Sequence, residues 1–146
     1  MRIIIIEDDD NQSDKLIRDI PKEIPNAQIY LYKTEHSFRS QIERVKEWKP
    51  DLFLIDIMLR WTNPSPDMPE APDEVIEEGF YVAGFRCKRD ILENSYLKNL
   101  PIILFTVLDK EDLKDKLSNL PRNISYISKD NLTSVLCDHI KRVVIE

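Results

Sequence analysis

Acidic, hydroxyl and basic side chains follow four short apolar segments, near the point where each segment ends. These residues are Glu7 and Asp8, then Asp56, then Thr106, and finally Lys129. Carboxylates held about 4 Å apart repel by roughly 4 kcal/mol at an effective dielectric near 20, so a cluster of them raises its pKa values or binds a cation. Because no His or thiolate accompanies them, their hard oxygen atoms favour Mg²⁺. A metal, a carboxylate, a hydroxyl and a lysine together indicate phosphoryl transfer onto a carboxylate.

Alternating strand and helix patterns predict one (βα)5 unit of the α/β class. Five short segments rich in β-branched or aromatic residues are the predicted strands: residues 3–6, 29–32, 52–57, 102–106 and 124–128. Their continuous apolar character is typical of strands covered on both faces, as in a doubly wound parallel sheet. Because the carboxyl ends of parallel strands meet at one edge, the polar residues that follow them are expected to converge there.

The segments between the predicted strands carry apolar residues at helical spacing. They predict helices around residues 16–24, 38–48, 75–92, 110–120 and 132–143. Pro21 is expected to bend or shorten the first helix, and Pro50 to end the second. Asp130 and Asn131 are candidate N-caps of the last helix.

The negative charge of the chain is concentrated in one stretch. The chain has 21 Lys and Arg against 27 Asp and Glu, a net charge of −6, which argues against a nucleic-acid partner. Between Trp61 and Phe85 there are six acids and no Lys or Arg. This Pro-rich stretch predicts an insertion at residues 60–78, between the third strand and the third helix. It is either a disordered, solvated loop or an element that docks a partner or covers the site.

Three features predict a cytoplasmic protein that does not enter a membrane. No apolar run approaches the roughly 18 to 20 residues needed to span a bilayer. The apolar run at residues 3–6 meets acids at once, unlike a signal peptide. Cys87 and Cys137 form neither a CxxC motif nor a zinc pattern, which fits a reducing compartment.

The ordered set of motifs resembles the receiver domain of two-component response regulators, in the CheY-like superfamily. The matching segments are IIIIEDD at residues 3–9, LFLIDIML at 52–59, PIILFT at 101–106 and YISKD at 126–130. The resemblance covers nearly the whole chain. It implies a flavodoxin-like or CheY-like sheet of five parallel strands in the order 2-1-3-4-5.

The same resemblance implies a role for each residue of the site. Asp56 would accept the phosphoryl group, and Thr106 and Lys129 would hold its oxygens. Tyr126 would be the aromatic switch residue whose rotamer couples to Thr106. The implied Mg²⁺ ligands are Asp8, Asp56 and the backbone carbonyl of Met58, with Glu7 acting through water.

The resemblance also implies a signalling protein rather than an enzyme, with at most self-catalysed phosphorylation and dephosphorylation. A histidine kinase or a histidine phosphotransfer protein would donate the phosphoryl group, and the output would be an altered contact with a downstream protein. A homodimer through the fourth helix, fifth strand and fifth helix is a further implication. Since the chain ends with the fifth helix at Glu146, we expect a stand-alone receiver, one domain over residues 1–146.

Two positions depart from the family pattern. Val107 stands where a small residue usually follows the Thr, so phosphorylation or hydrolysis is expected to be altered. Asp130 stands where a Pro in a cis peptide usually follows the Lys, which leaves the position of Lys129 open. Both departures favour an alternative, a degenerate receiver that binds proteins without phosphorylation. A third class, the haloacid-dehalogenase type of phosphohydrolase, needs an Asp where Met58 stands.

Overall fold

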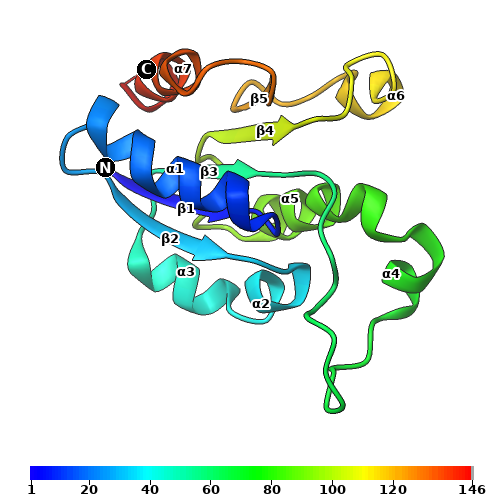
Figure 1. The fold of residues 1–146 in the computed structure, drawn as a ribbon. Coiled ribbons are helices and arrows are strands. Elements are labelled where there is room, and N and C mark those ends of the chain that lie inside the picture. Colours follow the sequence, from blue (N-terminus) through cyan, green and yellow to red (C-terminus); the bar gives the residue numbers. More distant parts are fainter. Residues whose placement is uncertain (146) are drawn as a thin grey trace.

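A five-stranded parallel sheet forms the centre of this computed structural model (Figure 1). The structure describes residues 1–145, and Glu146, the last residue of the predicted domain, lies outside the described residues. The strands are β1 (Arg2–Ile6), β2 (Gln28–Tyr32), β3 (Leu52–Ile55), β4 (Ile102–Thr106) and β5 (Ile124–Ser128). Every pairing is parallel and the order is β2-β1-β3-β4-β5, so the predicted fold class and strand order are confirmed.

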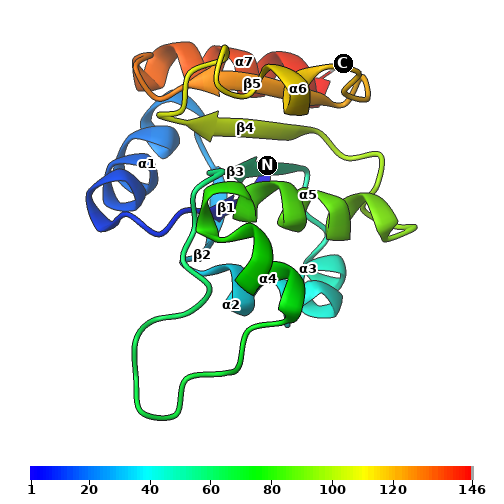
Figure 2. The ribbon, with the colours of Figure 1, turned by 90° about the vertical axis from the view of Figure 1, so that its right-hand side faces the viewer.

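Helices cover both faces of the sheet (Figures 1 and 2). One face is covered by α1 (Asp10–Glu23) and α7 (Thr133–Ile145), and the other by α2 (Glu35–Arg39), α3 (Ile42–Trp48) and α5 (Ala83–Glu93). Neighbouring residues of β1 face opposite ways, since Ile3 shares a buried core with Leu16 of α1, whereas Ile4 shares the other core with Phe38 of α2. Burial on both faces is the physical reason why the strand sequences are continuously apolar.

Several elements differ in extent from their predictions. Pro21 does not shorten α1, because a proline near the helix end removes only one backbone bond, and the N–H of Ile24 still donates to Ile20 (2.8 Å). The predicted second helix is two helices, α2 and α3, since Gln41 between them is not helical (φ −114°, ψ 21°). Of the predicted helix at 110–120, only the single turn α6 (Lys114–Leu117) forms.

The predicted third helix is interrupted at Gly79. The backbone of this residue (φ 79°, ψ −176°) lies in a region that favours glycine. It separates α4 (Asp73–Glu78) from the 3-10 turn η1 (Phe80–Val82) and from α5. Helix α4 therefore falls within residues 60–78. Figure 2 shows the long connection that leads to it, residues 56–72, below the body of the sheet.

The long connection is attached to the start of α2. The N–H groups of Glu35 and His36 donate to the carbonyl oxygens of Arg60 and Trp61 (3.0 and 2.9 Å). The Trp61 ring lies edge-on to His36, with 5.0 Å between ring centroids, and its Nε1–H donates to the Pro69 carbonyl (3.0 Å). The first part of the connection therefore packs against α2, in the layer of helices that covers this face of the sheet.

A buried ion pair joins α2 to α5. The Glu35 side chain is fully buried and that of Arg86 is 3% exposed. Nε and Nη2 of Arg86 donate to the two carboxylate oxygens of Glu35 at 2.7 and 2.8 Å, a bidentate geometry. Arg86 also donates to the Gly79 carbonyl (2.8 Å) and lies 3.4 Å from the Glu78 carboxylate. The pair therefore reaches the end of α4 as well.

Two further arginines hold the start of α4. Arg39 of α2 and Arg89 of α5 each donate to the Glu74 carboxylate at 2.7 Å. Arg39 also binds Glu35 (2.9 Å) and Asp90 (2.8 Å). The hydrogen bonds from Arg89 and Arg39 lower the pKa of Glu74 to about 2. An ionic network therefore attaches α4 to α2 and α5.

Replacement of Glu35 by Ala is expected to lower the free energy of unfolding by about 3 kcal/mol, because Arg86 would keep a buried charge without its main partner. Urea unfolding followed by circular dichroism measures the change. The matched control is Glu77→Ala at an exposed position of α4, which is expected to change stability by less than about 0.5 kcal/mol. Equal effects of the two substitutions would contradict the structural role of the buried pair.

The ionic attachment of α4 is expected to weaken in acid. The pKa of Glu74 is about 2 in the folded protein against an ordinary 4.5, so its contribution is fully present above about pH 4.5 and is lost as the pH falls toward 2. Glu74→Gln is therefore expected to be less stable than the wild type at neutral pH, by a difference that shrinks in acid. Urea unfolding across the pH range measures it, and Glu77→Gln should show no such trend.

Candidate functional site

The carboxylates of Glu7, Asp8 and Asp56 meet at the carboxyl edge of the sheet. The N–H of Glu7, directly after β1, donates to Tyr32 of β2 (3.0 Å), and the N–H of Asp56, directly after β3, donates to Ile6 of β1 (2.9 Å). These bonds extend the sheet by one residue, so the backbone itself fixes two of the acids. One carboxylate oxygen from each of the three residues lies within 4.8 Å of the others. The structure therefore brings together the three acids that the sequence singled out.

Lys129 places its ammonium group between two of these carboxylates. The backbone N–H of Lys129 donates to the carbonyl of Thr106 (2.9 Å). The side-chain Nζ lies 2.6 Å from a carboxylate oxygen of Glu7 and 2.9 Å from one of Asp56. The Lys129 side chain is 5% exposed, which makes the shared contact a buried one. Within residues 1–145 there is no cis peptide bond, and Asp130 does not prevent Lys129 from reaching the acids.

The close packing of these charges shifts their pKa values. Burial, and then the Asp56 carboxylate, raise the pKa of Glu7 to about 7, although Lys129 opposes the shift. Burial lowers the pKa of the Lys129 ammonium, but the carboxylates of Asp56 and Glu7 outweigh burial and raise it overall. The site therefore keeps its lysine charged and carries more negative charge than one ammonium neutralises.

Thr106 and Tyr126 are linked through the backbone of Leu108. Thr106 is buried at the end of β4, and its Oγ1 accepts a hydrogen bond from the Leu108 N–H (3.3 Å). The Tyr126 hydroxyl, from β5, donates to the Leu108 carbonyl (2.6 Å). The two residues predicted to act as a switch thus bind the same residue of the segment after β4.

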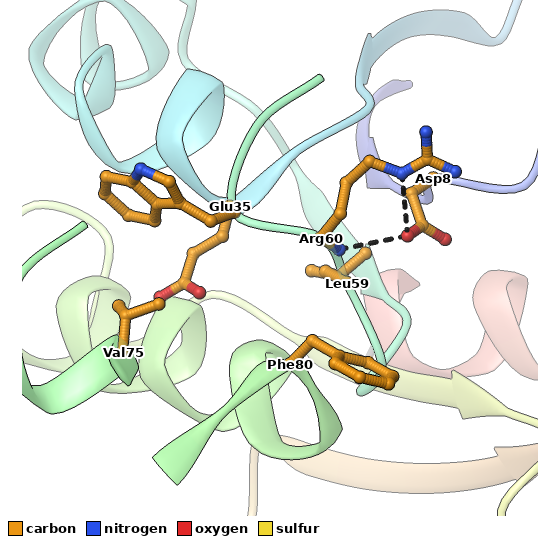
Figure 3. A pocket seen from close by; sticks show the side chains of 7 residues that line it. Asp8, Glu35, Leu59, Arg60, Val75 and Phe80 are labelled. Carbon is orange, nitrogen blue, oxygen red and sulfur yellow. Dashed lines mark hydrogen bonds and ion pairs between the residues drawn. The ribbon is translucent and has the colours of Figure 1, made fainter. Parts of the chain in front are cut away.

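Only the first two of the four consecutive acids after β1 belong to the cluster. Asp9 is the N-cap of α1, because its side chain accepts the Gln12 N–H (2.8 Å), and Asp10 pairs with Lys33. Asp8 instead accepts the backbone N–H of Arg60 at 3.0 Å, and the Arg60 guanidinium lies 3.5 Å from the same oxygen (Figure 3).

Two neighbouring hollows open beside the acids. The first, of about 310 Å³, is lined by Asp8, Asp9, Gln12, Asp56, Met58, Phe80, Val107 and Lys129. The second, of about 450 Å³, is shown in Figure 3 and is lined by Asp8, Glu35, Leu59, Arg60, Trp61, Val75 and Phe80. Asp8 and Phe80 line both hollows. Phe80 is 50% exposed and Val107 is 54% exposed, so apolar side chains flank the acids on the solvent side.

Gly84, at the start of α5, packs directly against the backbone of the central acid. A Cβ atom at this position would lie 2.3 Å from the Asp56 carbonyl oxygen and 2.6 Å from the Ile57 Cα. The N–H of Gly84 also donates to the Ile57 carbonyl (2.8 Å). Glycine is required here because backbone atoms, which cannot rotate away, occupy the space of a side chain.

Sequence reasoning missed three residues of this region. Gly84 carried a usable signal, since it is one of only two glycines in the chain. Arg60 carried none, because it comes from a segment that has no periodicity and no motif. Phe80 carried only the apolar spacing of the helix predicted at 75–92, which says nothing of a place beside the acids. The position of Phe80 beside Asp8 depends on the break at Gly79.

The fold is similar to that of solved receiver domains. The chain is similar to the signal receiver domain of a DNA-binding response regulator from Colwellia psychrerythraea 34H, with 20% identity, a TM-score of 0.68 and coverage of 100% of this chain and 99% of that one. It is also similar to the signal receiver domain of a signal transduction histidine kinase from Syntrophus aciditrophicus, with 23% identity, a TM-score of 0.65 and coverage of 98% and 89%. A LuxR-family DNA-binding response regulator from Staphylococcus aureus gives 16% identity, a TM-score of 0.67 and coverage of 98% of each chain.

These similarities confirm the CheY-like receiver fold that the motifs indicated. At such identities they establish the fold alone. No protein-family model matches the chain, and no curated protein matches it in sequence. Within residues 1–145, every helix is too short or too polar to cross a membrane.

Substitution of Gly84 by Ala is expected to lower the free energy of unfolding by about 1–3 kcal/mol, because the added methyl group overlaps the backbone that carries Asp56. Urea unfolding measures the loss. Glu93→Ala, at an exposed position of the same helix, is the control and is expected to have little effect. A Gly84→Ala protein as stable as the wild type would show that the strand end and α5 can separate without cost.

Proposed function

We propose that this protein is a response regulator receiver that accepts a phosphoryl group on Asp56. The observation that carries the proposal is the Lys129 ammonium, 2.9 Å from Asp56 and 2.6 Å from Glu7. In the reaction, a carboxylate oxygen of Asp56 forms a bond to phosphorus while the bond from phosphorus to the donor's histidine nitrogen breaks. Lys129 and Thr106 hold the phosphoryl oxygens, as a charged donor and a hydroxyl donor.

Mg²⁺ is the metal that suits the acids best, because they offer carboxylate oxygens and no nitrogen or sulfur ligand. Asp8, Asp56 and the backbone carbonyl of Met58 would hold it, with Glu7 acting through water. The raised pKa of Glu7 supports this assignment, since part of it reflects the Asp56 carboxylate, which a cation would offset. When bound, the ion supplies positive charge to the phosphoryl oxygens.

A histidine kinase or a histidine phosphotransfer protein is the proposed donor, and a changed contact with a downstream protein is the proposed output. A phosphoryl group on Asp56 draws the Thr106 hydroxyl away from the Leu108 N–H. The carbonyl of Leu108 also accepts a hydrogen bond from the Tyr126 hydroxyl. A shift of the Leu108 backbone therefore changes the hydrogen bond of Tyr126 as well. The surface of α6, β5 and α7, which includes the exposed Val135, would carry the change to a partner or to a second copy of the chain.

We also propose that residues 1–146 form a single receiver domain with an insertion at 60–78. The ionic contacts of Glu74 and Glu78 with α2 and α5 support this, since they attach the insertion to the layer that covers the same sheet. The domain acts as a phosphoacceptor rather than as an enzyme, with at most self-catalysed phosphorylation and dephosphorylation.

A degenerate receiver that binds proteins without phosphorylation is the second candidate function. The exposed side chains of Val107 and Phe80 favour it, because both line the hollow through which a donor reaches Asp56. The buried contact of Lys129 with Asp56 opposes it, because a binding module has no need to keep that charged group in place.

Incubation with acetyl phosphate and Mg²⁺ tests the choice between the two candidates. The wild type is expected to gain the mass of one phosphoryl group, measured by intact-protein mass spectrometry, and Asp56→Asn to gain none. Omission of Mg²⁺ is expected to abolish the gain in the wild type.

The control is Asp51→Asn, an exposed aspartate at the opposite end of β3, which should be phosphorylated like the wild type. A wild-type protein that gains no phosphoryl group would sink the phosphoacceptor proposal in favour of the degenerate receiver. A gain that persists in Asp56→Asn would assign the acceptor to another residue.

A further inference from the structure

Arg60 is the second positively charged side chain at the acidic cluster, after Lys129. Its Nε lies 3.5 Å from the Asp8 carboxylate, and its backbone N–H donates to the same oxygen at 3.0 Å. Figure 3 shows both contacts at the edge of the larger hollow. Within residues 1–145, Asp8 is the carboxylate with which the Arg60 guanidinium forms an ion pair.

Lys129 and Arg60 form ion pairs with different acids of the cluster. Lys129 is shared by Glu7 and Asp56, and the ion pair of Asp8 is with Arg60. The two cations differ in how firmly they are held, since the Lys129 side chain is 5% exposed and that of Arg60 is 51% exposed. A half-exposed guanidinium can leave its carboxylate and be solvated, whereas the buried ammonium cannot.

We propose that Arg60 competes with Mg²⁺ for Asp8, so that metal binding at the cluster and the ionic contact between Asp8 and the long connection oppose each other. The inference rests on the proposed function, because it takes Asp8 to be a metal ligand. A positive charge beside a ligand repels an incoming cation and also reduces the charge that the ligand offers. Arg60 therefore sets the Mg²⁺ concentration at which the site fills.

The backbone and the side chain of Arg60 have separate roles in this arrangement. The backbone N–H holds the Asp8 carboxylate in position whatever side chain residue 60 carries, whereas the guanidinium supplies the charge. The carbonyl oxygen of Arg60 is itself fixed by the Glu35 N–H (3.0 Å). A substitution at this position therefore removes the charge and keeps the orientation of Asp8.

Competition between two ligands of one carboxylate is reciprocal. If loss of the Arg60 charge favours the metal, then the metal must weaken the Arg60 contact by the same factor. Trp61 is the reporter of this effect, because it follows Arg60 directly and its carbonyl is held by the His36 N–H (2.9 Å). The other tryptophan, Trp48, ends α3 at the opposite end of the sheet.

Calorimetric titration with Mg²⁺ tests the inference on the wild type, Arg60→Gln and Arg60→Lys. Arg60→Gln is expected to bind Mg²⁺ about five- to tenfold more tightly, as the loss of one charge near a divalent cation predicts, and Arg60→Lys to remain close to the wild type. Lys33→Gln is the matched control. It removes one positive charge nearby, from a side chain that pairs with Asp10, and should change the affinity by less than about twofold.

A second readout follows the long connection itself. In the Trp48→Phe variant, Mg²⁺ is expected to change the fluorescence of Trp61. When Arg60→Gln is added to this variant, the change is expected to be much smaller. Both readouts report metal binding and need no phosphoryl donor.

Unchanged affinity in Arg60→Gln would overturn the inference, and weaker binding would overturn it in favour of an orienting role for the guanidinium. An equal gain in Lys33→Gln would overturn it too, because a general charge effect would then suffice. Failure of the proposed function is separate, since it would be seen as the absence of Mg²⁺ binding or of phosphorylation in the wild type.

Discussion

The ammonium of Lys129 between Glu7 and Asp56 is the interaction on which the rest of the structure depends. Both carboxylates are almost fully buried, and a buried carboxylate without a partner is strongly destabilising. The shared contact requires the ends of β1, β3 and β5 to lie at one edge of the sheet. β4 lies between β3 and β5, and its last residue, Thr106, binds the Lys129 backbone. A strand order that moved the end of β5 away from the ends of β1 and β3 would separate Lys129 from Glu7 and Asp56.

The sequence was enough to predict this edge because its determinants are local. Each strand is a short run of apolar residues, and a polar residue follows it. The pattern therefore places Asp56 and Lys129 at strand ends without knowledge of any contact. The parallel order then brings the strand ends together. Asp9, the third of the four consecutive acids after β1, also follows a local rule, since an acid before a helix is a common N-cap.

The features that could not be predicted depend on contacts between distant segments. Glu35 and Arg86 stand 51 residues apart in the chain, and no spacing rule pairs them. The break at Gly79 lies inside a helical apolar pattern, so periodicity alone joined α4 to α5. Arg60 was placed beside Asp8 by the bonds that hold the connection to α2. In each case the sequence supplies the residue type, and only the folded chain supplies its partner.

The concentration of negative charge in residues 61–85 looks different once these contacts are known. Two of its six acids, Glu74 and Glu78, pair with arginines that come from α2 and α5. Arginines of α2 and α5 therefore neutralise part of the negative charge of this stretch. Both these ion pairs and the buried side chain of Val75 attach α4, whereas the Phe80 side chain, just beyond α4, is half exposed beside Asp8. The uneven charge is thus part of what attaches α4 to α2 and α5.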